Sequence, residues 1–207
     1  MDGREVFFPA GEIILEGRIK KNQGKKGVVI CHPHPQFGGT MNNNVVDTLV
    51  EVFFNCGFTT LKFNFRGVGR SEGRYDGGKG EQRDVASAIN YLADMPIDKI
   101  HLAGYSFGAW VGAQLMMTDH RIKESVLISP PVGLLDFGFL HGSSSIKLVI
   151  YGERDNFCPY RQLSEIFNDL EEEGRLKMVK GADHFYWGKE EMIRGFIQNY
   201  LREGETC

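Results

Sequence analysis

The residues best suited to chemistry in this sequence begin with a serine at a predicted strand-to-helix turn. Ser106 lies in the segment GYSFG (104–108), which matches G-x-S-x-G. KIHLAG (99–104) predicts a strand before it, and the apolar run after it predicts a helix. A tight turn of this kind exposes the serine hydroxyl at its tip, and glycines on both sides avoid clashes between the crossing backbones. We interpret Ser106 as a nucleophile.

A serine hydroxyl is a weak nucleophile at neutral pH, so it needs a base and an acid that orients the base. Asp155 lies in GERDNFCP, just past a predicted strand, and His184 lies in GADHFYWG, just past another. Because parallel strands open their carboxyl ends on one edge of a sheet, the three side chains can meet there. We predict His184 as the general base and Asp155 as its orienting acid, with Asp183 too close in sequence for that role.

An acyl-transfer site also needs N–H donors for the negatively charged oxygen of the transition state. The helix that begins after Ser106 supplies the backbone N–H of Phe107. A second donor is expected from the loop HPHPQFGG (32–39), where we favour the backbone N–H of His34 and hold Gln36 in reserve.

Aromatic side chains flank the predicted site and are candidates for an apolar substrate pocket. They are Phe37, Phe107, Phe185, Tyr186 and Trp187, of which Phe37, Phe185 and Trp187 are the pocket candidates. Aromatic residues near strand ends more often pack in the core than contact substrate, so the identity of the substrate stays open.

The elements that must position these residues follow from the hydrophobic pattern. Two alternating runs within the first thirty residues predict antiparallel edge strands, and short apolar strands then alternate with helical segments near 42–55, 80–94, 107–118, 160–173 and 189–202. This pattern predicts a single α/β domain over 1–207, with a mostly parallel, twisted sheet of about eight strands and helices on both faces. Segment 129–145 is either a short lid or an amphipathic crossover helix, and we favour the helix.

Two segments, CHPHPQFGGTMNN and FNFRGVGRSEG, resemble the α/β-hydrolase superfamily, in particular small bacterial hydrolases without a cap that are related to dienelactone hydrolases and X-Pro dipeptidyl peptidases. The resemblance covers about residues 10–203. It implies an α/β-hydrolase fold without a large cap domain, a triad at Ser106, Asp155 and His184, and an oxyanion loop at 32–37. Asn64 departs from the Asp that is frequent in related F-D-x-R-G motifs, which we expect to change local hydrogen bonds more than chemistry. Arg66 is expected to pair with backbone or carboxylate groups.

Charge and composition exclude several classes of function. The formal net charge of −3 gives no basic footprint for nucleic acid. No apolar run is long enough to span a membrane, and the first residues lack the pattern of a secretory signal, so we expect a cytoplasmic protein without a membrane partner. His32 and His34 have no third ligand at a suitable spacing, so we expect no metal.

Together these features predict a serine hydrolase that cleaves small carboxylic esters through an acyl-serine intermediate, without a cofactor, as a monomer or small homo-oligomer. An aminoacyl peptidase or a thioesterase would use the same triad. A catalytic cysteine at Cys31 or Cys158 and a non-catalytic binding protein of the same fold are less favoured alternatives.

Overall fold

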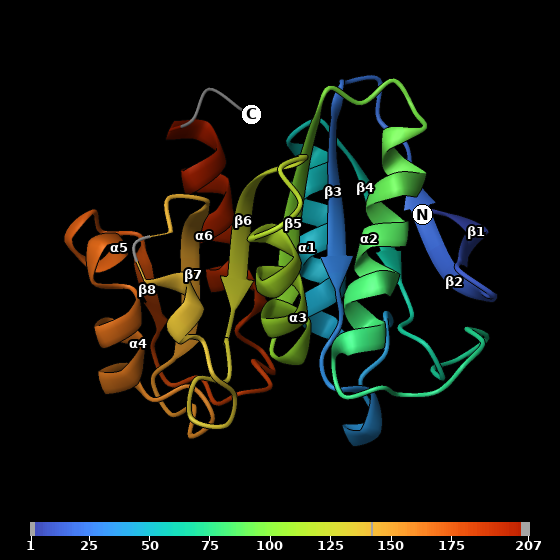
Figure 1. The fold of residues 1–207 in the computed structure, drawn as a ribbon. Helices are drawn as coiled ribbons and strands as arrows, with labels where there is room; N and C mark the ends of the chain where they lie inside the picture. The colour runs from blue at the N-terminus through green and yellow to red at the C-terminus, as the bar shows by residue number, and fades with distance from the viewer. Residues whose placement is uncertain (1–2, 142, 204–207) are drawn as a thin grey trace.

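One eight-stranded sheet runs through the molecule (Figure 1), seen in a computed structural model that describes residues 3–141 and 143–203. Its strands are β1 (Arg4–Ala10), β2 (Ile13–Lys20), β3 (Lys26–Cys31), β4 (Phe58–Phe63), β5 (Lys99–Tyr105), β6 (Ile122–Ile128), β7 (Ile146–Gly152) and β8 (Leu176–Val179). Their order across the sheet is β1-β2-β4-β3-β5-β6-β7-β8. β2 pairs antiparallel with β1 and with β4, and the remaining neighbours are parallel, which confirms the predicted edge strands and mostly parallel sheet.

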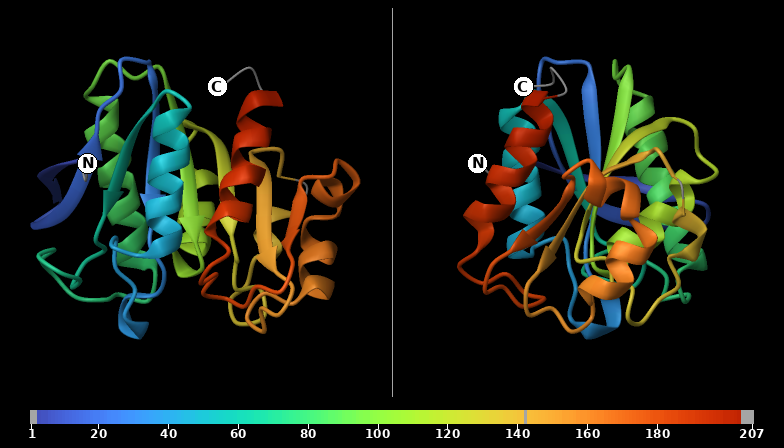
Figure 2. Two further views of the ribbon diagram at one scale, coloured as in Figure 1. Left: turned by 180° about the vertical axis from the view of Figure 1, so that it is seen from behind. Right: turned by 90° about the vertical axis from the view of Figure 1, so that its left-hand side faces the viewer.

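Helices cover both faces of this sheet. They are α1 (Asn44–Asn55), α2 (Lys79–Ala93), α3 (Phe107–Met116), α4 (Tyr160–Ile166), α5 (Asn168–Glu172) and α6 (Glu190–Glu203), with the 3₁₀ turns η1 (Pro35–Phe37) and η2 (Gly138–Leu140). Figure 2 shows α1 and α6 on one face and α2 and α3 on the other. Each face has its own cluster of buried apolar side chains, so the sheet is the middle layer of three.

The sequence explains why β3 and α1 form where they do. β3 reads KGVVIC, and its last five residues are buried, as expected of a central parallel strand covered on both faces. α1 begins after Asn43, whose side-chain oxygen accepts the backbone N–H of Val45 at 3.0 Å. Its buried side chains, among them Val45, Leu49 and Val52, recur at helical spacing and face the sheet.

The single helix predicted near 160–173 is wrong in one respect, because the structure divides it. α4 ends at Ile166 and α5 begins at Asn168, while Phe167 between them has φ −114° and ψ 36°. Ile, Phe and Asn in succession are only moderate helix formers. The Phe167 side chain is nevertheless buried, so the break leaves the packing against the sheet in place.

The favoured crossover helix in 129–145 is also wrong. The described part of this connection between β6 and β7 is irregular, apart from the single turn η2. Pro130 and Pro131 lack the backbone N–H that a helix needs, and glycines follow them. Buried Phe137 and the indole N–H of Trp110, which donates to the Asp136 carbonyl at 2.9 Å, tie the segment to α3 instead.

The carboxyl ends of the parallel strands open on the lower edge of the molecule in Figure 1. The loops that follow β3, β5, β6, β7 and β8 all leave the sheet there, as parallel strands require. Each predicted site residue lies on one of these loops or at the first turn of α3.

Candidate active site

Ser106 occupies a strained turn between β5 and α3. Its φ of 55° and ψ of −120° lie in a region that residues with a side chain rarely adopt. Gly104 and Gly108 make the turn possible: a Cβ on Gly104 would lie 2.6 Å from the Ala109 backbone, and one on Gly108 would lie 2.5 Å from the Cys31 carbonyl oxygen. The two glycines thus let the turn at Ser106 pack directly against β3 and α3.

The structure brings Ser106, His184 and Asp155 into one chain of hydrogen bonds. His184 Nε2 lies 2.9 Å from Ser106 Oγ, and His184 Nδ1 lies 2.8 Å from Asp155 Oδ2. An ionised carboxylate only accepts, so Nδ1 carries the proton and the lone pair of Nε2 faces the serine hydroxyl. The Asp155 side chain is fully buried, whereas that of His184 keeps 11% exposure at the site. This geometry suits the transfer of the Ser106 proton to His184.

The Asp155 carboxylate has two further hydrogen-bond partners, and one of them bonds a third residue in turn. Its Oδ1 accepts the backbone N–H of Phe157 at 3.0 Å, and its Oδ2 lies 2.6 Å from Ser129 Oγ. Ser129 Oγ in turn lies 2.6 Å from the Tyr186 hydroxyl. No sequence motif identifies Ser129, which precedes two prolines. Tyr186 lies between Phe185 and Trp187, and nothing in the sequence distinguishes its role from theirs.

The backbone of His184 is also held. Tyr105, the last residue of β5, donates from its hydroxyl to the His184 carbonyl at 2.5 Å. Burial, together with the negative charges of Asp155 and Asp183, raises the pKa of Tyr105, which therefore keeps its proton. The histidine is thus positioned through both its ring and its main chain.

Two backbone N–H groups are candidates for an oxyanion hole. Neither Phe107 nor His34 donates its N–H to a backbone acceptor within the part of the chain that the structure describes. Gln36 donates its N–H to His34 Nδ1 at 3.2 Å, and Phe37 donates to the His34 carbonyl at 3.1 Å. The geometry therefore favours His34 over Gln36, whose donor is already used within its own loop.

Tyr75 contacts the ring of His34, and no sequence motif indicates this contact. Because His34 Nδ1 accepts from Gln36, the neutral ring carries its proton on Nε2, which lies 3.3 Å from the Tyr75 hydroxyl. Burial lowers the pKa of His34, which favours this neutral form. The Tyr75 hydroxyl then keeps its own proton available for another acceptor.

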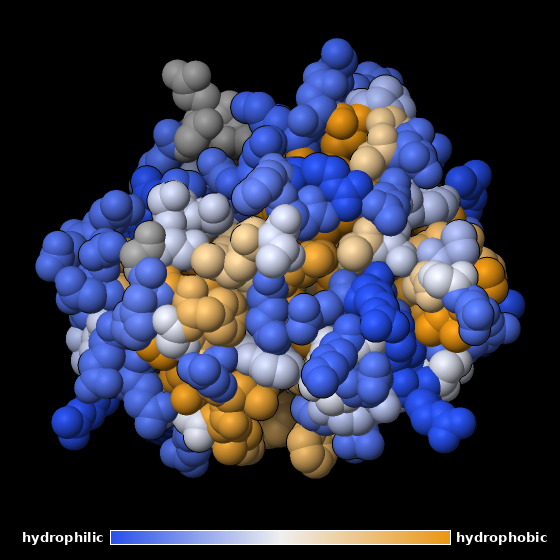
Figure 3. All heavy atoms as spheres, viewed as in Figure 1, coloured by the Kyte–Doolittle hydropathy of each residue, from blue (hydrophilic) through white to orange (hydrophobic). Residues whose placement is uncertain are grey.

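The predicted pocket residues lie on the loops around the site and are exposed. Phe37 is 84% exposed, Phe185 54% and Trp187 73%. Phe185 lies 5.8 Å from the His184 ring between centroids, and Phe157, which the sequence analysis did not name, lies 4.9 Å from it. Figure 3 shows apolar surface gathered along the lower edge of the molecule, below β6 and β7. We call Phe37, Phe157 and Phe185 the apolar rim.

Two surface hollows lie away from these residues. One of about 180 Å³ is lined by residues of β2, β4 and α1, and one of about 570 Å³ by residues beside β7 and α5. Neither hollow is lined by Ser106 or His184.

The less favoured alternatives can be compared with the same geometry. His32 Nδ1 lies 2.6 Å from the Pro33 carbonyl, and His32 Nε2 accepts the Phe65 N–H at 3.0 Å, so both ring nitrogens are used. Burial lowers the pKa of His32 to about 4. Burial raises the pKa of the Cys31 and Cys158 thiols, which disfavours a reactive thiolate at either position.

No group of three or more histidine, cysteine or acidic residues that could hold a metal ion occurs within 3–141 and 143–203. Over the same residues, no helix combines the length and the apolar character needed to cross a membrane.

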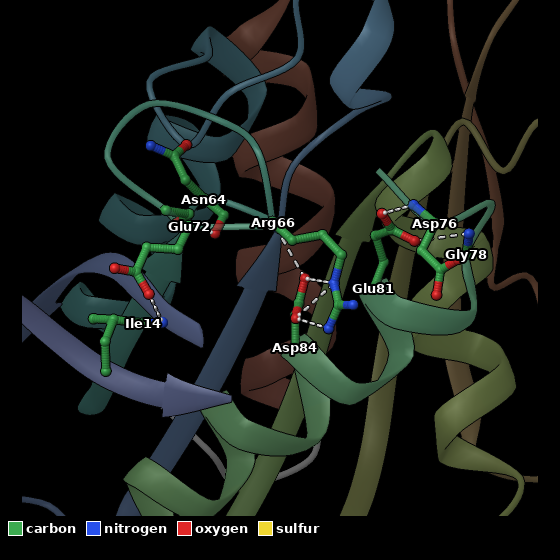
Figure 4. A network of polar contacts seen from close by, with 9 residues as sticks. Ile14, Asn64, Arg66, Glu72, Asp76, Gly78, Glu81 and Asp84 are labelled. Carbon is green, nitrogen blue, oxygen red and sulfur yellow. Dashed lines mark hydrogen bonds and ion pairs between the residues drawn. The ribbon is translucent and has the colours of Figure 1, made fainter. Parts of the chain in front are cut away.

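A separate polar network stabilises the loop between β4 and α2 (Figure 4). Arg66 contacts the buried Asp84 carboxylate through both Nε and Nη2, the shorter distance being 2.7 Å. Glu81 accepts the backbone N–H groups of Asp76 and Gly78 at 2.9 and 2.7 Å. The predicted carboxylate pairing of Arg66 is confirmed.

Asn64 lies in the same loop region and bridges two segments. Its Oδ1 accepts the Met41 N–H, and its Nδ2 donates to Glu16 Oε2, each at 2.8 Å. Glu16 is 8% exposed and also accepts the Arg70 N–H at 2.8 Å. An amide is needed here because a carboxylate could not donate to Glu16, which explains the departure from Asp in structural terms.

Comparisons with known proteins agree with this architecture. The sequence profile of the α/β hydrolase fold family matches residues 28–146. A protein of unknown function from Agrobacterium tumefaciens has a solved structure that is 38% identical, covers 98% of this chain and 98% of its own, and superposes with a TM-score of 0.88.

Two further solved structures are similar over nearly the whole chain. An α/β serine hydrolase homologue from Coxiella burnetii is 33% identical, with 97% of this chain and 98% of that chain covered and a TM-score of 0.86. XC6422 from Xanthomonas campestris, described as an α/β serine hydrolase without lid, is 28% identical, with coverages of 98% and 95% and a TM-score of 0.84. The expected fold without a large cap is therefore confirmed.

Proposed function

Because the chain belongs to the α/β hydrolase family, we propose that it is a serine hydrolase that cleaves small carboxylic esters through Ser106. The observation that carries the proposal is the pair of distances that joins Ser106 Oγ to His184 and His184 to a fully buried Asp155. A hydrogen-bonded nucleophile, base and acid at strand ends is the arrangement that acyl transfer uses.

The first half-reaction follows from the proton positions. Ser106 Oγ attacks the ester carbonyl while its proton moves to His184 Nε2, and Asp155 stabilises the imidazolium that forms. The N–H groups of Phe107 and His34 donate to the oxyanion of the tetrahedral intermediate, each contributing about 3 kcal/mol. His184 then returns its proton to the leaving alkoxide, which departs as the alcohol and leaves an acyl-Ser106.

The second half-reaction reverses these roles with water. His184 Nε2 takes a proton from the water as its oxygen attacks the acyl carbon, and the same two donors hold the oxyanion. Collapse of the intermediate expels Ser106 Oγ, which recovers its proton from His184. The products are the carboxylic acid and the free enzyme, and no cofactor takes part.

The apolar rim supports a substrate with an uncharged, apolar portion beside the ester. Phe157 and Phe185 both have rings within 6 Å of the His184 ring, and both are more than 40% exposed. Aromatic surface next to a reacting centre gains by covering apolar ligand atoms. A substrate that reaches from Ser106 to the rim would gain this contact without a cap.

The experiment that tests the proposal is intact mass after reaction with a fluorophosphonate probe under native conditions. We expect one adduct on the wild-type chain and none on Ser106→Ala or His184→Ala. Ser125→Ala is the matched control, because Ser125 is a buried serine of β6 whose hydroxyl bonds the Met116 sulfur at 3.0 Å. A folded wild-type chain that forms no adduct would instead support the non-catalytic binding protein.

Substrate class is tested separately on matched ester, thioester and amide compounds with the same acyl group. We expect the highest kcat/KM on the ester. A higher value on the thioester or the amide would replace esterase by thioesterase or aminoacyl peptidase, while the residue roles would stay the same.

A further inference from the structure

Ser129 occupies the same place on its strand as Ser106 does on the neighbouring one. Ser106 follows β5 and donates its backbone N–H to Ile128 at 2.9 Å, and Ser129 follows β6 and donates to Ile150 at 2.8 Å. Both serines have a positive φ, 55° and 42°. The sheet therefore presents two serines side by side in strained conformations at its carboxyl edge.

Backbone strain in the described residues is confined to this region. Apart from glycines, the described residues with positive φ are Ser106, Ser129 and Tyr186, the last with φ 58°. All three belong to the hydrogen-bonded chain through Asp155. Unfavourable backbone conformations persist where surrounding structure holds them, and they concentrate at functional sites.

The direction of the hydrogen bonds follows from counting protons. The Asp155 carboxylate can only accept, so Ser129 donates to Oδ2. A hydroxyl has a single proton, and therefore Tyr186 must donate to Ser129 Oγ. Both hydroxyls are completely buried, which leaves no solvent to replace either bond.

We propose that Tyr186 and Ser129 are positioning residues that hold the Asp155 carboxylate for His184. Oδ2 then accepts from both Ser129 and His184, while Oδ1 accepts from the Phe157 N–H, so three hydrogen bonds orient the carboxylate. No proton moves between Tyr186, Ser129 and Asp155 during the reaction. The inference rests on the proposed function for its kinetic readout and stands on geometry for its structural one.

The chain also sets how basic the carboxylate is. A hydrogen bond to an ionised group favours that form, so removing the Ser129 hydroxyl concentrates negative charge on the side facing His184. The imidazolium would then be better stabilised, and the histidine would stay protonated to a higher pH. The sign of the expected change is therefore an upward shift of the acid limb of the activity profile.

Among the described residues, the titratable groups close to Asp155 and His184 include Tyr105 on β5, Cys158 after β7, and Asp183 and Tyr186 before α6. Burial raises the pKa of Tyr105, Cys158 and Tyr186, so these three stay neutral around neutral pH. Asp183 is exposed and accepts the Phe185 N–H at 2.9 Å.

The test measures Ser129→Ala and Tyr186→Phe by the pH dependence of kcat/KM and by NMR titration of the His184 ring in the free protein. For Ser129→Ala we expect kcat/KM to fall about tenfold, the equivalent of one hydrogen bond to a charged group, with KM unchanged. We expect both titration midpoints to rise by about half a pH unit or more. Tyr186→Phe should change both in the same direction by less.

Ser125→Ala and Tyr200→Phe are matched controls. Ser125→Ala removes a buried hydroxyl that bonds the Met116 sulfur, and Tyr200→Phe removes a half-buried hydroxyl that donates to Glu124. Both hydroxyls lie away from the triad. Both controls should keep the wild-type midpoints. Unchanged midpoints in Ser129→Ala and Tyr186→Phe, or shifts equal to those of the controls, would overturn the proposal. If Ser129→Ala fails to fold, Tyr186→Phe alone decides it.

The NMR readout separates this inference from the proposed function. A wild-type chain that forms no fluorophosphonate adduct would defeat the proposed function, while the His184 titration in the variants would still measure the positioning. An active wild type with unshifted variants would defeat the positioning alone.

Discussion

Two buried polar networks lie at the carboxyl edge of the sheet, and they differ in how they end. In the β4–α2 loop, Arg66 and Asp84 satisfy each other, and Glu81 accepts two backbone N–H groups (Figure 4). The network through Asp155 instead passes from a buried carboxylate through His184 to Ser106 Oγ. The first is closed on itself, whereas the second ends on an atom that can react. Of these two networks, only the one through Asp155 connects a buried carboxylate to a hydroxyl that could act as a nucleophile.

The largest expected effect breaks the open network at its end. Ser106→Ala should lower kcat/KM by about 10⁴-fold or more, since removing the nucleophile of a triad removes its concerted action. The free energy of unfolding should change by only about 1 kcal/mol, because no ion pair is lost. Steady-state kinetics and urea denaturation measure the two. If Ser106→Ala unfolds as well as losing activity, the network through Asp155 also stabilises the fold, and the contrast with the Arg66–Asp84 network fails.

The closed network should respond in the opposite way. Asp84→Ala should lower the free energy of unfolding by about 3–5 kcal/mol, because Arg66 would be left as a largely buried, uncompensated charge. Urea denaturation measures the loss. The double variant Arg66→Met/Asp84→Leu removes both charges and should cost less than the single change. Equal losses in the two would argue against the ion pair as the cause.

A smaller effect is expected at Asn64. Asn64→Asp would place a second carboxylate against the buried Glu16, so one of the two must take up a proton or lose its hydrogen bond. We expect a loss of about 1–3 kcal/mol in unfolding free energy at pH 7 that diminishes at lower pH. Adding Glu16→Gln should recover part of it. If Asn64→Asp is as stable as the wild type at pH 7, donation to Glu16 does not explain why this chain has Asn in place of Asp at position 64.

The smallest effect per pH unit is expected from two buried histidines, His32 and His101, which should lower the free energy of unfolding as the pH falls. Burial lowers the pKa of His32 and of His101 to about 4, whereas an unfolded histidine titrates near 6.5. Between those values the unfolded state binds more protons, so stability is fully present above about pH 6.5 and falls as pH drops toward 4. The slope is roughly 1 kcal/mol per pH unit for each histidine.

Urea denaturation at pH 7, 6 and 5 measures this slope, and His101→Gln should reduce it by about half. His184 is the proposed base and must be neutral to accept a proton, so its protonation should lower activity as the pH falls. A pH–activity profile that stays flat from pH 5 to 8 with chemistry limiting would contradict the assigned base.

Most of the fold and the central site could be predicted because local signals were strong. The G-x-S-x-G turn, the alternation of strands and helices, and the placement of Asp155 and His184 after strands were sufficient to bring three distant residues together. Ser129 and Tyr186 could not be found in this way. Their contacts with Asp155 and with each other join loops that no motif links, and their positive φ values exist only in the folded chain.

The predictions fail where hydrophobic periodicity does not determine the backbone conformation. Apolar residues predict a crossover helix in 129–145, but Pro130, Pro131 and the following glycines outweigh that periodicity. The break at Phe167 depends on a single residue leaving helical dihedral angles, which periodicity does not register. Tyr75 and Phe157 reach the site through loop geometry alone.

The position of β8 at the far end of the sheet has a consequence for biosynthesis. His184 follows β8, whereas Ser106 follows β5 near the middle of the chain. During translation, the nucleophile and its elbow therefore leave the ribosome well before the base that would activate them. In the proposed mechanism, Ser106 therefore has no base until the residues that follow β8 have joined the fold.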